Sequence, residues 1–438
     1  MYTLTAAPAD ERRPIDDPAD ADLRLGAPAR YQSDFGRSTI ATPRLAILAR
    51  SEHEVVTALA AARARGLRYR VRGAGHSCDG QSLAADGMVI ANENADASPV
   101  VALGDGLFDL AARAHWRGVE RALNRAGWTV PVLPDYLDLS IGGTLSVGGF
   151  GFDSASQSTQ LDHVERIRLI AAHGHAVWCS ATERPDLFSR ALAGLGQAGV
   201  IERVVVRARP FRPASTLLVT RHPSLEGLID SIGWMPEHPE RVPPLFKGVT
   251  ARGATSACYG FASTTLREAR RLDWRPPGDL AIARRYDLVR HRQLRALSVK
   301  LWVAAFGRAH RLWSDYVLDY EGLVAFERFL QTLLARDAFG GCLKSIYVLA
   351  IRKRPRAVAL PFDAATAIAG SIGFGIGLYS MVPAGRHDLV RRVRVAAAAC
   401  LERCLELNGR PYRYGCHDID ERMARSIYGD AAVPEMTR

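Results

Sequence analysis

The stretch "RVRGAGHSCDGQSL", residues 70–83, places His76 in a loop of glycine, serine and aspartate directly after a strand. Residues 69–73, "YRVRG", are typical of a short strand, and "MVIAN" at 88–92 is typical of the next one. Glycine tolerates unusual backbone angles and lets an anion approach closely, so such a loop exposes successive N–H groups. The stretch therefore predicts an anion-binding loop at the end of a strand.

The same loop shares features with a dinucleotide-binding motif. Gly73 and Gly75 match the first two glycines of GxGxxG, and Glu93 lies near the position of the acid that binds the ribose. The third glycine position holds Cys78, however, and residues 74–87 are too few for the crossover helix of a Rossmann unit. The spacing therefore excludes a Rossmann fold.

A second glycine-rich loop, "SIGGTLSVGGFGF", occupies residues 140–152 and carries Thr144 and Ser146 between its glycines. Two loops with many N–H and hydroxyl donors in one domain predict a cradle for a diphosphate. The alternative, that both loops are only tight turns, remains open.

Helical and strand patterns alternate along the chain. Ser51 and Glu54 form a capping box before an apolar-periodic run that ends near Gly66, which predicts a helix. Further helices are expected at 107–126, 186–196, 319–336 and 386–408, and further strands at 164–172, 177–180, 199–210 and 345–352. After about residue 213 prolines cluster and the pattern of turns and helices becomes irregular, which indicates a domain boundary there. Together these patterns indicate an α+β protein of two domains.

The composition is that of a soluble globular protein, with 438 residues, 48% hydrophobic and 24% charged. The net charge of +11 comes from scattered arginines without the aromatic-plus-basic motif of a nucleic-acid module, so no nucleic-acid partner is expected. The seven cysteines lack the spacing of a zinc site, so we expect no metal and a reduced compartment. Because no secretory signal or membrane-spanning run is visible, we expect a cytoplasmic protein without a membrane partner and with a flexible N-terminus at 1–30.

Four motifs together resemble a known family. They are "VRGAGHSCDGQSL", "PDYLDLSIGGTLSVGGFG", "LDHVERIRLIAAHGHAVWCS" and "PDLFSRALAGLGQAGVIERVVV", and they cover about residues 35–210. They closely resemble the FAD-binding domain of the vanillyl-alcohol oxidase and p-cresol methylhydroxylase superfamily (PCMH type), and within it the cytokinin dehydrogenases. The resemblance implies a PCMH-type FAD-binding domain at 31–212, a substrate domain at 213–405 and a C-terminal segment at 406–438 that returns towards the flavin.

The resemblance also assigns residues to FAD. His76 falls on the position that carries the cofactor through a covalent bond from a ring nitrogen to the flavin 8-methyl carbon. Tyr136 stands where some relatives form a second link through cysteine, so a single link is expected, with Cys78 as a spectator. The other residues that the resemblance places around the diphosphate and the flavin are Arg72, Gly73, Ala74, Gly75, Ser77, Gln81, Ser140, Gly142, Gly143, Thr144, Ser146, Gly149, Phe150, Val200, Ile201 and Tyr412.

Asp135 matches the aspartate that hydrogen-bonds the substrate amine in cytokinin dehydrogenases. Beside a flavin and partly desolvated, such a carboxylate would have a raised pKa and act as the proton acceptor. Asp138 is its nearest competitor, and the alternative is that Asp135 is an aspartate of a surface loop.

The resemblance thins after residue 213. Trp313 resembles a tryptophan that lines the family's substrate cavity, although it fits a core position equally well. The acidic residue with which cytokinin dehydrogenases grip the adenine ring has no clear match among Glu226, Glu237 and Glu240. The family's Pro-Gly-Gln near the C-terminus is absent from this sequence.

The resemblance, together with the two glycine-rich loops, implies an oxidoreductase with covalently bound FAD. It would take a hydride from a C–H next to nitrogen or oxygen in a small amine or alcohol and pass the electrons to oxygen or another acceptor. The substrate would be a cytokinin-like amine or a compound of secondary metabolism. A sugar-lactone or alditol oxidase is the enzymatic alternative, which the aspartate at position 135 argues against, and a catalytically inactive flavin-binding protein is the alternative of another class. A substrate that bleaches the flavin under nitrogen would distinguish an enzyme from a binder.

Overall fold

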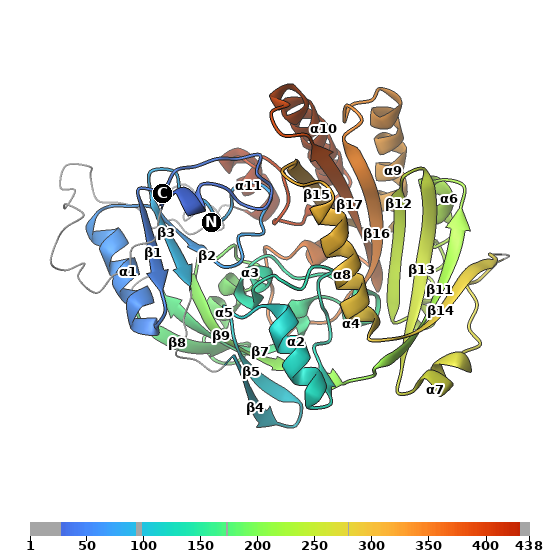
Figure 1. The fold of residues 1–438 in the computed structure, drawn as a ribbon, viewed down its shortest axis with the longest axis horizontal. Helices are drawn as coiled ribbons and strands as arrows, with labels where there is room; N and C mark the ends of the chain where they lie inside the picture. The colour runs from blue at the N-terminus through green and yellow to red at the C-terminus, as the bar shows by residue number, and fades with distance from the viewer. Residues whose placement is uncertain (1–27, 93–98, 172–173, 279, 430–438) are drawn as a thin grey trace.

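The structure is a computed structural model that describes residues 28–92, 99–171, 174–278 and 280–429. Two units lie side by side, and each is built on its own β-sheets with helices packed around them (Figure 1). The expected α+β class is confirmed. The expected flexible N-terminus and Glu93 lie largely or wholly outside the described residues.

The N-terminal unit begins with a three-stranded parallel sheet in the order β1-β3-β2. Its strands are β1 (Leu45–Ala49), β2 (Tyr69–Arg72) and β3 (Met88–Asn92), and helix α1 (Glu52–Ala64) joins the first two. The expected N-cap is present, since Ser51 Oγ accepts from the Glu54 N–H at 3.1 Å. The Glu54 carboxylate accepts from the N–H of Arg50, one residue before the cap, at 2.7 Å, so this bond differs from the second bond of a capping box. No helix lies between β2 and β3, which confirms the prediction that this segment is not a Rossmann unit.

A five-stranded antiparallel sheet completes this unit, in the order β4-β5-β9-β7-β8. Its strands are β4 (Val100–Gly104), β5 (Leu107–Ala111), β7 (Val164–Ala171), β8 (Ala176–Ser180) and β9 (Gly199–Arg207), and a small pair is formed by β6 (Trp128–Thr129) and β10 (Arg209–Pro210). The helices are α2 (Trp116–Arg125), α3 (Ile141–Leu145), α4 (Ser154–Gln157) and α5 (Pro185–Ala191).

One expected helix is wrong in its first part. Residues 107–111 form strand β5 instead of helix, because they pair with β4 on one side and with β9 on the other. Apolar spacing within one segment cannot reveal a partner strand that follows about ninety residues later in the chain, so tertiary pairing decided this segment.

The C-terminal unit is an eight-stranded antiparallel sheet in the order β14-β11-β13-β12-β16-β17-β15-β18. Its strands are β11 (Ala214–His222), β12 (Leu245–Ala251), β13 (Ala254–Ser263), β14 (Ile282–Val289), β15 (His310–Leu318), β16 (Leu343–Arg352), β17 (Ile372–Val382) and β18 (Arg410–Pro411). The helices are α6 (Leu225–Asp230), α7 (Leu266–Arg270), α8 (His291–Ala304), α9 (Tyr320–Ala335), α10 (His387–Glu406) and α11 (Glu421–Tyr428).

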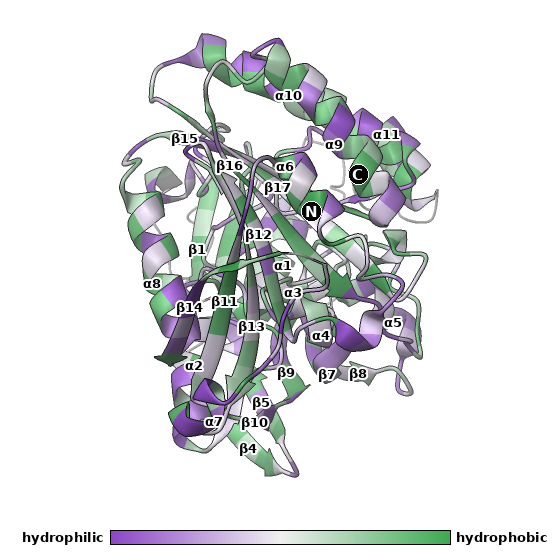
Figure 2. Ribbon diagram, turned by 90° about the vertical axis from the view of Figure 1, so that its right-hand side faces the viewer, coloured by the Kyte–Doolittle hydropathy of each residue, from purple (hydrophilic) through white to green (hydrophobic). Residues whose placement is uncertain are grey.

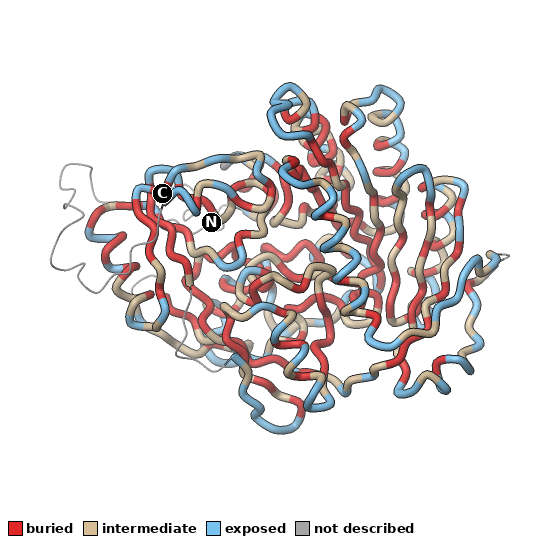
Figure 3. Tube along the Cα trace, in the orientation of Figure 1, coloured by how far each residue is buried: buried red, intermediate tan, exposed pale blue. Residues whose placement is uncertain are grey.

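The two faces of this sheet have different neighbours because side chains alternate along each strand. Helices α9 and α10 pack on one face, whereas α8 lies on the other (Figure 2). Phe246, Val348 and Leu378 belong to the core beneath the helices, and their neighbours in sequence, Lys247 and Tyr347 among them, face the N-terminal unit. The central strands are buried over most of their length (Figure 3).

No helix within the described residues combines the length and the apolar character needed to cross a bilayer.

Candidate active site

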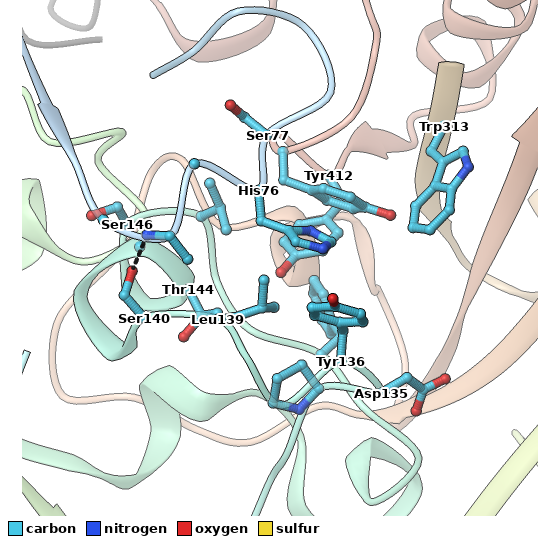
Figure 4. A pocket seen from close by; sticks show the side chains of 18 of the residues that line it. His76, Ser77, Asp135, Tyr136, Leu139, Ser140, Thr144, Ser146, Trp313 and Tyr412 are labelled. Atoms are coloured by element: carbon cyan, nitrogen blue, oxygen red, sulfur yellow. Dashed lines mark hydrogen bonds between the residues drawn. The ribbon is translucent and has the colours of Figure 1, made fainter. Parts of the chain in front are cut away.

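A cavity of about 500 Å³ lies where the two units meet. Both glycine-rich loops line it from the N-terminal unit, and β12, β16, β17 and α8 line it from the C-terminal unit. Figure 4 shows His76 and Tyr136 in its middle, with Ser140 and Thr144 on one side and Trp313 and Asp135 on the other.

The two glycine-rich loops touch each other at Ser140. Ser140 Oγ accepts a hydrogen bond from the Ala74 N–H at 3.3 Å (Figure 4). A Cβ at Gly73 would lie 2.9 Å from Cβ of Ser140, and a Cβ at Gly143 would lie 2.8 Å from its Oγ. Gly75 adopts a φ of +64°, which favours glycine. Only glycines permit this close approach of the loops around the cavity.

The second loop is fastened from outside. Thr144 Oγ1 accepts from the Trp116 indole at 2.9 Å, which ties helix α3 to helix α2. The Gly149 N–H donates to the Tyr412 hydroxyl at 3.1 Å, so a residue near the end of the chain holds the end of this loop.

His76 projects into the cavity between two aromatic rings. Its ring stacks on Phe35 with centroids 3.6 Å apart and lies 4.5 Å from the ring of Tyr136. Its Nε2 is buried and has no hydrogen-bond partner among the described residues. Burial lowers the pKa of His76 to about 3, so the imidazole is neutral at neutral pH and a ring nitrogen keeps a free electron pair.

The structure brings nearly all the residues expected around FAD to this one cavity. Those that line it are Gly73, Ala74, Gly75, His76, Ser77, Gln81, Ser140, Gly142, Gly143, Thr144, Ser146, Phe150, Val200, Ile201 and Tyr412, together with Asp135. The other two do not line it: Arg72 donates its guanidinium to the Ser33 carbonyl at 3.0 Å, and Gly149 donates its N–H to the hydroxyl of Tyr412, which does line the cavity.

The expectation of a raised pKa at Asp135 is wrong. Asp135 accepts from Lys247 on β12 at 2.5 Å and also from Arg295 on α8. Burial raises the pKa of Asp135, but the charges of Arg295 and Lys247 outweigh burial and hold the pKa well below its usual range. Asp135 is therefore ionised and fully engaged with two cations. Asp138 is paired with Arg117 and Lys300 and does not line the cavity.

The three glutamates considered for substrate binding are exposed and lie away from the cavity. The residues that line the cavity do not include Glu226, Glu237 or Glu240.

The far wall of the cavity is aromatic. Trp313 on β15 stacks on Tyr379 on β17, with centroids 4.0 Å apart and planes 11° from parallel. The ring centroids of Trp302 on α8 and Trp313 are 6.1 Å apart, and the ring of Tyr347 on β16 packs edge-on against Tyr379 with centroids 5.2 Å apart. Trp313 thus lines the cavity, although it is only 5% exposed.

Sequence reasoning missed most of this wall. One signal was available: glycine at every second position of β17, at 373, 375 and 377. Repeated glycine on one face of a strand is typical of a close approach by other groups.

The C-terminal segment closes one side of the cavity. The Cys78 N–H donates to the Tyr414 carbonyl at 2.9 Å, and Gln81 Nε2 donates to the carbonyls of Arg413 and Gly415 at 3.0 and 2.9 Å. These bonds connect the first glycine-rich loop to the residues that follow β18.

Comparison with known proteins agrees with this geometry. Residues 43–180 match the family described as FAD binding domain. This part of the chain is an FAD-binding domain. It contains the parallel sheet, both glycine-rich loops and His76, and the match ends with strand β8.

Two relatives illustrate the reach of the similarity. The chain is 37% identical over 175 residues to an uncharacterized oxidoreductase, ORF5 in the fasciation locus of Rhodococcoides fascians, and this match covers 40% of each chain. It is 36% identical over 184 residues to cytokinin dehydrogenase 1 of Oryza sativa subsp. japonica, covering 40% of this chain and 35% of the relative. The matches thus span about two fifths of the length of these relatives.

The residues around the cavity fit FAD. The glycines of the two loops leave room where a Cβ would intrude, and hydroxyls and backbone N–H groups gather beside that room. The neutral imidazole of His76, whose Nε2 has no protein partner among the described residues, faces the same space. An anionic diphosphate and a flat ring system suit these two parts of the cavity.

Proposed function

We propose that the protein is an FAD-dependent oxidoreductase that oxidises a C–N or C–O bond of a small amine or alcohol. The observation that supports this best is the single cavity in which the glycine-rich loops and His76 face an aromatic wall of the second sheet. FAD, when bound, supplies a two-electron hydride acceptor. The relatives named as oxidoreductase and cytokinin dehydrogenase favour the same class of reaction.

In this proposal the N-terminal unit holds the cofactor. The backbone of Gly73, Ala74 and Gly75 and the loop from Ser140 to Ser146 bind the diphosphate, and Val200, Ile201 and Tyr412 border the flavin. His76 carries the flavin through one covalent bond. Stacking on Phe35 fixes the plane of the imidazole, so the attachment would need little further ordering of the side chain.

The C-terminal unit binds the substrate. Stacked Trp313 and Tyr379, with Trp302 beside them, offer a flat apolar surface on which a ring or an unsaturated chain packs. The cationic pair Lys247 and Arg295 shares the single charge of Asp135, which leaves this edge of the cavity net positive. We infer that the substrate is a planar amine or alcohol, with cytokinins as one candidate class.

Anaerobic reduction of the flavin tests this function. The purified protein would be mixed under nitrogen with a panel containing a cytokinin, aromatic primary alcohols and aromatic amines, and the visible flavin absorbance would be recorded. Bleaching by at least one class is expected. A spectrum unchanged by every compound would argue for a flavin-binding protein without this activity.

A further inference from the structure

Asp315, Gly377 and Tyr347 form a row across three neighbouring strands. Asp315 on β15 pairs in register with Gly377 on β17, and Gly377 pairs with Tyr347 on β16. The glycine contributes no side chain, so the Asp315 carboxylate reaches across it and accepts a hydrogen bond from the Tyr347 hydroxyl. A Cβ at Gly377 would lie 2.6 Å from Cζ of Tyr347 and would overlap Oδ1 of Asp315. The glycine therefore makes this bond possible.

The row connects the cavity to a buried carboxylate. Tyr347 lines the cavity, whereas Asp315 lies behind it and is 3% exposed. Burial raises the pKa of Asp315 to about 6, although the hydroxyls of Tyr347 and Tyr414 and the charge of Lys247 act in the opposite direction. Asp315 thus changes its protonation close to neutral pH.

The other acidic groups near the cavity are engaged differently. Asp135 is bound to two cations, which makes it a very weak base. Asp34 accepts from Ser77 and from the N–H groups of Arg37 and Gly80, and these bonds fix the first glycine-rich loop. Asp315, by contrast, accepts from the hydroxyl of Tyr347, which belongs to the aromatic wall of the cavity.

We propose that Tyr347 and Asp315 form a proton relay, in which Tyr347 takes the O–H or N–H proton of the substrate while its own phenolic proton passes to Asp315. This inference rests on the proposed function and specifies its proton acceptor. Tyr347 is the residue that would touch the substrate, and Asp315 acts through it.

With this relay, every electron and proton that leaves the substrate has a defined acceptor. The substrate carbon loses a hydride, with both electrons of the C–H bond, to the bound flavin. The electron pair of the substrate O–H or N–H bond becomes the second bond of C=O or C=N, and its proton goes to Tyr347. Asp315 ends neutral and returns its proton to water, and oxygen or another oxidant takes the two electrons in a later step.

Several other titratable groups surround Asp315 and Tyr347, and their titrations must be distinguished from that of Asp315. They are Lys247 on β12, Tyr379 on β17, and Cys78, Tyr414 and His417 from loops. Burial raises the pKa values of the thiol and the two tyrosines and lowers that of His417 to about 3. Burial also lowers the pKa of Lys247, which Asp135 supports in its charged form. A variant of Asp315 itself is therefore needed to assign any titration.

The test uses the flavin-loaded protein and the variants Asp315→Asn and Tyr347→Phe. Asparagine keeps the shape of the acceptor without its charge, and phenylalanine removes only the hydroxyl. Glu327→Gln is the matched control, because Glu327 is a buried carboxylate with a raised pKa that is bonded to Gln331 on α9, outside the cavity lining.

The first measurement is infrared difference spectroscopy between about pH 5 and pH 8, the range that brackets the Asp315 titration. In the wild type a protonated carboxylic acid band should disappear with a midpoint near pH 6, and this component should be missing from Asp315→Asn and unchanged in Glu327→Gln. In Tyr347→Phe the band should remain with a higher midpoint, because the Tyr347 hydroxyl lowers the pKa of Asp315. Absence of such a band from the wild type would overturn the relay without requiring any variant to fold.

The second measurement is the rate of anaerobic flavin bleaching by a compound from the panel. The wild-type rate should rise through about pH 6, where Asp315 becomes ionised. Both active-site variants should reduce the limiting rate by about 100-fold or more, with a smaller change in the half-saturating concentration, because a general base contributes roughly that much. Asp315→Asn should also lose the pH step, and Glu327→Gln should behave as the wild type.

The outcomes separate the two proposals. Bleaching that is equally fast in all four proteins, with the pH step kept in Asp315→Asn, would refute the relay and leave the oxidoreductase function intact. A wild type that no compound bleaches would refute the function and the relay together.

Discussion

Replacing Gly377 with alanine should destabilise the protein because the row across β15, β17 and β16 has no space for a methyl group. The added Cβ would lie 2.6 Å from Cζ of Tyr347, and it would also overlap the Asp315 carboxylate. Overpacking a well-packed site costs about 1–3 kcal/mol. Alanine recovers roughly 0.5–1 kcal/mol relative to glycine in a strand. We expect a net loss of about 1–2 kcal/mol in the free energy of unfolding.

Gly375→Ala is the matched control on the same strand and the same face. Its Cβ would first meet Cδ1 of Ile351 at 3.3 Å, the end of a flexible side chain that moves at little cost. This variant should be as stable as the wild type or more stable by up to about 1 kcal/mol, because alanine restricts the unfolded chain more than glycine does. Denaturant unfolding of the flavin-loaded proteins, followed by tryptophan fluorescence, measures both changes. Equal stability of the two variants would refute the packing of Asp315 and Tyr347 around position 377.

Three further perturbations test other parts of the site. The pKa of Asp135 is held below its usual value of 3.8, so ionised Asp135 stabilises the fold above about pH 4 and this stabilisation is lost as the pH falls. The difference in unfolding midpoint between the wild type and Asp135→Asn should therefore shrink in acid. The pKa of Asp315 is raised from 3.8 to about 6, so the pH dependence is reversed: the protonated carboxyl stabilises the fold at low pH, and this stabilisation is lost as the pH rises. From about pH 4 to pH 7 the wild type should lose about 2 kcal/mol relative to Asp315→Asn, and parallel curves for the two proteins would contradict the raised pKa. Tyr412→Phe removes the acceptor of the Gly149 N–H and should lower the free energy of unfolding by about 1 kcal/mol in the same assay, whereas an unchanged value would show that this bond does not hold the loop.

Local signals in the sequence predicted local structure well. The N-cap at Ser51 begins α1, and the glycine-rich stretches at 73–75 and 140–149 meet at one cavity. Each of these features is decided by residues close together in the chain, where backbone freedom and capping act directly.

What the sequence could not predict depends on distant partners. The pKa of Asp135 follows from Lys247 and Arg295, which lie 112 and 160 residues away along the chain. Likewise, the bond between Asp315 and Tyr347 exists because β17 separates their strands with a glycine, which only the order of the sheet reveals. No periodicity or motif within either segment carries that information.

The central claim is that one flavin is held between the two glycine-rich loops and is bound through His76. Acid denaturation of the purified protein, followed by visible absorption of pellet and supernatant and by the intact mass, tests it most directly. The account predicts that the wild-type pellet stays yellow and carries the mass of one FAD, whereas His76→Ala releases its flavin to the supernatant. A wild type that releases its flavin in acid, or a His76→Ala variant that retains it, would contradict the claim.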